Sequence, residues 1–242
     1  MASGVELLAA VPDPTGLAAG ELARSQKTRR RILDAGIACL VEEGYKELST
    51  VLVARRAGIT RAAMLYHFPS RRDLLVAIVH HVTRRRIENF EAAMRDLPKD
   101  RSFRTRVVDA VAMELASPEF RAYAELAAAA RSDRQLAEAL RPAMAAYDDA
   151  RAELGRRLFP PGTTEAPDFQ LVRDIVRFLS EGLALQEVAL LGMRRPRERL
   201  TALRHFLHLL VSTPDGFRLL ERAAAEAPAQ PPFRRPRWPA RS

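Results

Sequence analysis

The 242-residue chain is 48% hydrophobic and contains 39 Lys or Arg, 30 Asp or Glu and a single Cys. This composition excludes a largely disordered chain, because enough apolar side chains are present to build a core. One cysteine excludes a disulfide framework and a cysteine-rich zinc site. No stretch approaches the roughly 20 apolar residues of a membrane-spanning helix, and the first 23 residues lack the basic start of a signal peptide. We therefore expect a cytoplasmic protein that is not embedded in a membrane.

The excess of positive charge lies in one part of the sequence. The formal net charge is +9, and residues 24–86 alone hold fourteen basic and five acidic side chains. Residues 87–226 are close to neutral, whereas residues 227–242 carry four arginines and no acid. A basic segment beside a neutral body is typical of a protein that binds nucleic acid.

Apolar residues recur at helical spacing along most of the chain, and strand-type alternation is scarce, so we expect an all-α protein. Residues 1–24 are rich in Ala, Gly and Pro and are expected to form a flexible arm. Pro142 is expected to kink or break the helix that contains it. The expected helices span residues 28–43, 50–57, 61–67, 71–97, 103–116, 118–131, 134–158, 169–191 and 197–211.

The first four expected helices have clear start and stop signals. Ser49 and Thr60 can each cap a short helix, and Ser70 with Asp73 has the spacing of a capping box. Gly44 and Gly58 follow the first and second helices, where glycine commonly ends a helix. The boundaries of these four helices are therefore predicted by local chemistry.

The sequence STVLVARRAGITRAAMLYHF, residues 49–68, has the form of a helix-turn-helix. Small residues at Ala54 and Ala57 let two short helices cross closely, and Gly58 permits the tight turn between them. The second helix of such a unit can enter the major groove of DNA. A hairpin of this kind can also serve only for packing, so a helical ligand-binding or interaction protein without DNA binding is the alternative.

Residues on both sides of this hairpin extend the pattern. The stretch TRRRILDAGIACLVEEGY, the hairpin and then LYHFPSRRDLL together resemble the DNA-binding domain of the TetR family of bacterial transcription regulators, over about residues 26–80. The resemblance implies an N-terminal helix-turn-helix domain of three helices at 25–72. A long helix would join it to a helical ligand-binding and dimerisation domain at 73–226, followed by a disordered Pro/Arg-rich tail at 227–242.

The resemblance also implies which side chains meet DNA. Arg61 would make a bidentate contact to guanine, because it is the side chain of the recognition helix best suited to one. Leu65 stands where the family usually has tyrosine, so a phosphate contact would be lost or pass to Tyr66. Leu52 stands where a polar residue is common. The residues expected at the groove or at phosphates are Lys27, Thr28, Arg29, Ser49, Thr60, Arg61, Ala62, Ala63, Tyr66, His67 and Arg71.

Members of this family commonly place an effector among the central helices. A small apolar or aromatic effector is expected here, although an acid held by arginine is also compatible with the sequence. The expected lining residues are Phe103, Met113, Phe120, Tyr123, Met144 and Tyr147. Homodimers would form through the helices at 169–191 and 197–211, and the expected function is a ligand-responsive repressor that binds a near-palindromic operator.

Other chemistry receives little support from the sequence. Cys39 lies in an apolar helical stripe, which favours a core residue over a redox sensor. His205 and His208 are spaced as half of a metal site, without further ligands nearby, so neither a metal nor another cofactor is expected. The run Arg84–Arg86 is interpreted as a charged surface. No common enzyme motif is present, and the chain is not expected to be an enzyme, although an enzyme built on a helical bundle is a further alternative.

Overall fold

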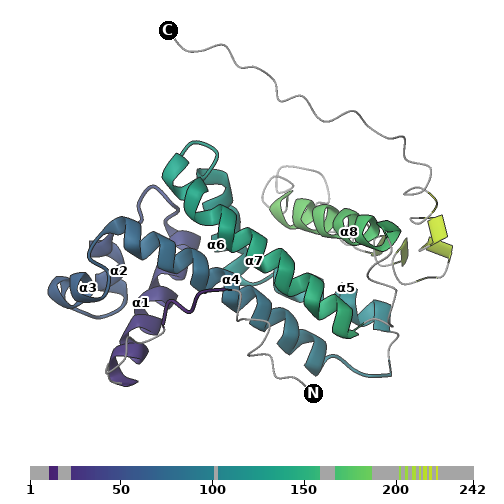
Figure 1. Ribbon diagram of the computed structural model, residues 1–242, viewed down its shortest axis with the longest axis horizontal. Helices are drawn as coiled ribbons and strands as arrows, with labels where there is room; N and C mark the ends of the chain where they lie inside the picture. The colour runs from purple at the N-terminus through teal and green to yellow at the C-terminus, as the bar shows by residue number, and fades with distance from the viewer. Residues whose placement is uncertain are drawn as a thin grey trace, which may run out of the picture.

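The computed structural model describes residues 11–15, 23–100, 103–158 and 167–186, with scattered positions between 202 and 222. Within these ranges the chain is helical and contains no strand, which confirms the all-α class (Figure 1). No described helix is both long and apolar enough to cross a membrane. The helices are α1 (Ala23–Glu42), α2 (Thr50–Arg56), α3 (Arg61–His67), α4 (Arg71–Asp96), α5 (Phe103–Leu115), α6 (Pro118–Ala129), α7 (Arg134–Leu158) and α8 (Pro167–Gln186).

The capping signals read from the sequence are confirmed. The side chains of Ser49, Thr60 and Ser70 each accept the backbone N–H three residues further on, at 3.1–3.2 Å. Asp73 completes the capping box of α4 by accepting the backbone N–H of Ser70. Gly58 has φ of 63°, a left-handed conformation that non-glycine residues adopt at a cost, so the turn between α2 and α3 requires glycine.

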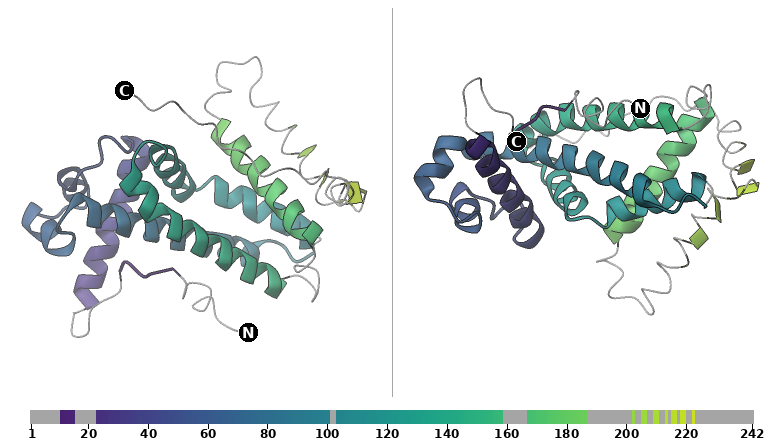
Figure 2. Two further views of the ribbon diagram at one scale, coloured as in Figure 1. Left: turned by 45° about the horizontal axis from the view of Figure 1, so that its top comes forward. Right: turned by 90° about the horizontal axis from the view of Figure 1, so that it is seen from below.

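Helices α1–α4 share one hydrophobic core, and α6 and α7 close it from the other side. Cys39 is 0% exposed in this core, as its place in the apolar stripe predicts. The long helix α4 packs against α1, α5, α6 and α7, while α8 packs on α5 (Figures 1 and 2). The residues that form the centre of this core include Ile32, Leu33, Leu40, Met64, Phe68, Leu74, Ile78, Ala122, Leu126, Leu136 and Leu140.

Helices α7 and α8 begin at or near the expected positions. Pro142 does not divide α7, which runs as one helix from Arg134 to Leu158. Helix α8 starts near the expected position and is described to Gln186. The rest of the expected 169–191 helix, most of 197–211, including His208, and the tail at 227–242 lie outside the described residues.

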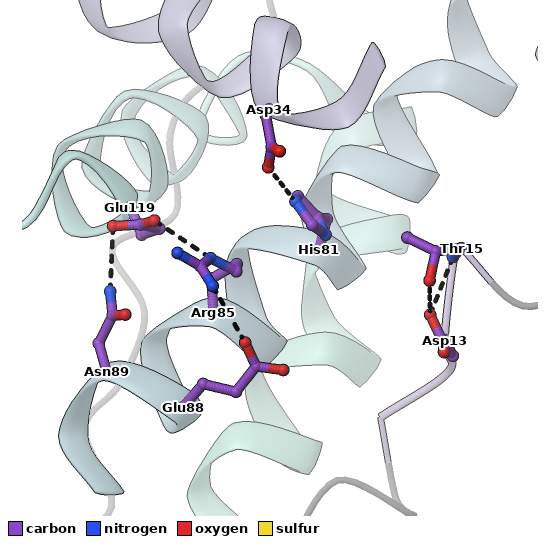
Figure 3. A network of polar contacts seen from close by, with 8 residues as sticks. All are labelled: Asp13, Thr15, Asp34, His81, Arg85, Glu88, Asn89 and Glu119. Carbon is purple, nitrogen blue, oxygen red and sulfur yellow. Dashed lines mark hydrogen bonds and ion pairs between the residues drawn. The ribbon is translucent and has the colours of Figure 1, made fainter. Parts of the chain in front are cut away.

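Residues 11–15, which lie within the arm expected at 1–24, pack against the bundle. Val11 is 1% exposed and packs against Ile87 of α4 and Tyr147 of α7. Thr15 is 4% exposed, and its N–H and hydroxyl both donate to the Asp13 carboxylate (Figure 3). The composition of this stretch could not reveal these contacts, because the partners of Val11 lie far away in the sequence.

A polar network joins α4 to its neighbours (Figure 3). The buried His81 of α4 lies 2.7 Å from the carboxylate of Asp34 on α1. One turn further along α4, Arg85 approaches Glu119 of α6 at 3.4 Å, and Asn89 donates to the same carboxylate at 3.0 Å. Helix α4 is thus tied by polar contacts to elements on both sides of it.

Candidate nucleic-acid interface

The recognition helix α3 turns one face inward and the other to solvent. Met64 is 0% exposed and anchors the helix in the core, followed by the buried Phe68 at its C-cap. Thr60, Arg61 and Ala62 are exposed, and Ala63 is partly exposed. The residues expected to read the groove therefore stand on the accessible side of a short helix held from beneath.

Arg61 is the exposed arginine of α3. It forms no hydrogen bond or ion pair with any residue that the structure describes. Its guanidinium therefore retains a full set of planar donors, which match the two major-groove acceptors of guanine. Tyr66, 73% exposed with its ring edge-on to His67 at 5.1 Å, extends the same surface.

Arg71 has an internal role that its sequence position does not reveal. Its Nε donates to the carbonyl of Leu48 at 2.8 Å, and its Nη2 donates to the carbonyl of Tyr45 at 3.2 Å. The guanidinium also lies 4.8 Å from the centre of the Tyr45 ring. Arg71 therefore fixes the loop before α2 to the start of α4, while the side chain remains at the surface.

The α1 residues expected to contact phosphates differ in their exposure and in their bonds within the protein. Lys27 is exposed, and Thr28 donates its hydroxyl to the carbonyl of Arg24 at 3.0 Å. Arg29 is half-buried, and its guanidinium donates to the carbonyls of Pro14 and His67. At the start of α2, the Ser49 side-chain oxygen caps the helix by accepting the backbone N–H of Leu52. Of this α1 group, Lys27 is thus the exposed basic side chain.

The largest correction concerns the run Arg84–Arg86. Arg86 is not on the surface: it is 1% exposed, and its Nε donates to Glu114 of α5 at 2.6 Å. Glu181 of α8 approaches Nη2 at 3.6 Å. Burial opposes the charge, but Tyr147 and the two carboxylates raise the pKa of Arg86 above its ordinary value. The spacing held a signal for this burial, because Arg86 follows the buried Leu74, Ile78 and Val82 at intervals of four residues.

Three of the expected effector residues surround this arginine. The rings of Phe120, Tyr123 and Tyr147 have their centres 5.3, 4.3 and 4.3 Å from the Arg86 guanidinium. We call these four residues the Arg86 cluster. Burial raises the pKa of Tyr123, so its hydroxyl stays neutral near pH 7.

The other three expected effector residues are not gathered there. Met144 packs against the core shared by α1–α4, α6 and α7, and Met113 is 54% exposed on α5. Helix α5 begins at Phe103, but the position of that side chain lies outside what the structure describes. The described members of the expected lining are thus divided between an enclosed cluster, the core and the surface.

Comparison with known proteins places these features in a family. The model of bacterial regulatory proteins of the tetR family matches residues 32–78, which include α2 and α3. An HTH-type transcriptional regulator of Mycobacterium tuberculosis is 32% identical over 152 residues, which cover 59% of this chain and 78% of that protein. Over a shorter stretch of 57 residues, the regulator SrpR of Pseudomonas putida is 35% identical, covering 24% of this chain and 27% of SrpR.

Solved structures share the fold beyond the DNA-binding segment. A transcriptional regulator from Saccharomonospora viridis, in complex with choline, has a TM-score of 0.58 at 19% identity and covers 78% of this chain and 97% of its own. A regulator from Rhodococcus sp. Rha1 has a TM-score of 0.56 at 21% identity, with 75% and 94% covered. With its capped recognition helix exposed at residues 60–63, this chain belongs to the tetR family of bacterial regulatory proteins and is a DNA-binding transcriptional regulator.

Proposed function

We propose that the chain is a homodimeric repressor that binds a near-palindromic operator and releases it when a small molecule enters the helical bundle. The main support for DNA binding through α3 is the exposed face of this helix, on which Arg61 bonds to no residue that the structure describes. A helix of seven residues covers only a few base pairs, so a single copy buries too little surface for tight, specific binding. Two copies on one face of the duplex, with recognition helices about 34 Å apart, overcome this limit.

The surface of α8 supports the proposed dimer. Phe178, Leu179 and Leu185 are 59%, 48% and 54% exposed, although each is large and apolar. Large apolar side chains left exposed on one helix mark an interaction site in many proteins. We propose that a second copy covers these side chains, with the 169–191 and 197–211 segments of both chains forming a four-helix bundle.

The Arg86 cluster is our proposed effector site. Its three rings supply flat apolar surfaces for a small apolar or aromatic molecule, and Arg86 Nη2 has no hydrogen-bond partner in the described part of the chain. Because α4 carries Arg86 and also packs against α1 in the DNA-binding domain, a ligand that displaces Arg86 acts on the helix that both parts share. Binding would favour one arrangement of α4 over another and thereby change operator affinity.

The DNA-reading assignment is tested with an operator selected from fragments of the source genome. Arg61→Ala should cost about 1–3 kcal/mol of binding free energy and relax specificity at one base pair. Lys27→Ala is the control, because loss of an exposed phosphate contact weakens all sequences alike and lowers the slope against salt. If the Arg61→Ala variant discriminates between base pairs as well as the wild-type protein does, Arg61 does not determine base specificity.

The dimer is tested by sedimentation of the full chain. Leu179→Asp places a charge on the exposed α8 face and should convert a dimer at micromolar concentration into a monomer. Val51→Asp is the matched control, since Val51 is a similarly exposed apolar residue, at 56%, but lies on α2. A monomeric unchanged protein, or a Leu179→Asp variant that stays dimeric, contradicts this interface.

A further inference from the structure

Residues 11–15, which we call the clasp, connect the bundle to the end of the recognition helix. We propose that the clasp and Arg29 position α3 for DNA binding, and that Arg29 is a positioning residue and not a phosphate contact. The inference rests on DNA binding through α3, and it assigns a role to a segment outside the helix-turn-helix.

The first anchor of the clasp lies in the bundle. The Val11 side chain is 1% exposed and sits in a small apolar cluster with Ile87 of α4 and with Ala146, Tyr147 and Ala150 of α7. The Val11 carbonyl accepts a hydrogen bond from Arg84 Nη1 at 2.8 Å. Both the side chain and the backbone of one residue are therefore held by the bundle.

A local turn stiffens the clasp between its two anchors. The Asp13 carboxylate accepts the Thr15 N–H at 2.9 Å and the Thr15 hydroxyl at 2.7 Å (Figure 3). Burial opposes the Asp13 charge, but the Thr15 hydrogen bonds and the nearby Arg84 and Arg30 lower its pKa. The turn is thus held in its charged form between basic side chains of α1 and α4.

The second anchor is Arg29 on α1. Its Nε donates to the carbonyl of Pro14 at 3.0 Å, and its Nη1 donates to the carbonyl of His67 at 3.2 Å. The guanidinium also lies 4.7 Å from the centre of the Phe68 ring. His67 ends α3 and Phe68 is its C-cap, so one side chain joins the clasp to the end of the recognition helix.

This arrangement adds a polar connection between the recognition helix and the bundle. It acts beside the packing of Met64 in the core and the chain itself, which passes from α3 directly into α4. Because α3 has only seven residues, fixing its C-terminal end also fixes the direction of its groove-facing end. Tyr147 contacts both Val11 and Arg86, so the clasp also touches the Arg86 cluster.

The proposal is tested by operator binding at several salt concentrations with Val11→Asp, Arg29→Gln and the double variant. Each single variant should weaken operator binding about tenfold. The double variant should bind the operator no more weakly than the weaker-binding single variant, because both substitutions remove the same connection. The slope of log affinity against log salt should be unchanged for Val11→Asp and Arg29→Gln. Lys27→Gln, the exposed control on the same helix, should lower that slope by roughly one.

Two results of this experiment overturn the proposal. A slope lowered by roughly one in Arg29→Gln identifies a phosphate contact. Losses that multiply in the double variant show that Val11 and Arg29 act separately. If Val11→Asp fails to fold, Val11→Ala takes its place with a smaller expected loss.

A second measurement needs no DNA and separates this proposal from the proposed repressor function. Hydrogen exchange in the free protein should become faster in α3 of Val11→Asp and remain unchanged in α6. If hydrogen exchange in α3 is equally fast in Val11→Asp and in the wild-type protein, the proposed role of the clasp is wrong, even if the wild-type protein binds DNA well. If the wild-type protein binds no operator but α3 exchanges faster in Val11→Asp, the proposed repressor function is wrong and the role of the clasp stands.

Discussion

The Tyr45 hydroxyl donates a hydrogen bond to the Asp133 carboxylate and so links the end of α1 to the start of α7. The Tyr45 backbone N–H donates to Glu125 of α6 at 2.9 Å, and the Arg71 guanidinium covers the ring. Tyr45, the residue after Gly44, therefore joins the DNA-binding helices to both α6 and α7.

Tyr45→Phe should lower the free energy of unfolding at pH 7. The hydrogen bond from Tyr45 is the main cause that lowers the pKa of Asp133 below its ordinary value of about 3.9. A carboxyl whose pKa is lower in the folded chain than in the unfolded chain stabilises the folded state at pH values above the unfolded pKa. This contribution disappears as the pH falls through the folded pKa. The difference between the variant and the unchanged protein in urea unfolding should therefore shrink below about pH 4. Tyr66→Phe, with its exposed ring, should show no such difference at either pH.

Gly36→Ala should destabilise the DNA-binding domain although alanine favours helices. A Cβ at Gly36 would lie 2.5 Å from Ile78 Cδ1 and 2.9 Å from Cγ1, and Ile78 is 0% exposed with little room to move. We expect a net loss of about 1–2 kcal/mol, because overpacking outweighs the gain in helix propensity. Adding Ile78→Val removes the closest atom and should recover part of the loss in thermal unfolding. A more stable Gly36→Ala variant would contradict the close crossing of α1 and α4.

Arg86→Met should cost far more stability than Arg85→Met. Removing Arg86 leaves the Glu114 side chain, 1% exposed, without its partner, which typically costs about 3–5 kcal/mol. The Arg85 side chain is 44% exposed, so loss of its ion pairs should cost at most about 1 kcal/mol. Urea unfolding of both variants measures the contrast, and Glu114→Leu added to Arg86→Met should restore much of the loss. Equal effects at the two positions would show that Arg86 is not enclosed.

Stability should fall on mild acidification because of His80. Burial lowers the pKa of His80 below its ordinary value of about 6.5, and its Nδ1 has no hydrogen-bond partner in the described part of the chain. The folded chain then binds fewer protons than the unfolded chain below that pH. The contribution of His80 is therefore complete above about pH 6.5 and lost as the pH falls toward the folded pKa. In the His80→Gln variant, the free energy of unfolding should depend less on pH over this window. If its pH dependence matches that of the wild-type protein, other groups cause the loss of stability in acid.

Local chemistry explains what could be predicted from the sequence. Ser49, Thr60 and the Ser70–Asp73 box cap their helices within three or four residues, so their partners are visible in the sequence itself. The placement of residues 60–63 on an accessible surface was implied by the family resemblance, and the structure shows them exposed or partly exposed. The bounds of these helices were therefore predictable to within a few residues.

Long-range partners explain what could not be predicted. Arg29 and Arg71 bond to backbone carbonyls of other segments, and carbonyls carry no signature in a sequence. Val11 packs on Tyr147, 136 positions away, so composition alone suggested a loose arm. Arg86 was assigned to the surface by its charge, although its spacing from Val82 placed it on the buried stripe of α4.

The enclosed Cys39 makes the protein a convenient object for spectroscopy. It is the only cysteine in the sequence, it is 0% exposed, and burial raises the pKa of its thiol. A thiol-directed dye should therefore leave the native molecule unlabelled and attach only when the α1–α4 core opens. A cysteine engineered at the surface can then carry a fluorophore or spin label with little background, and the slow labelling of Cys39 itself times the opening of the core.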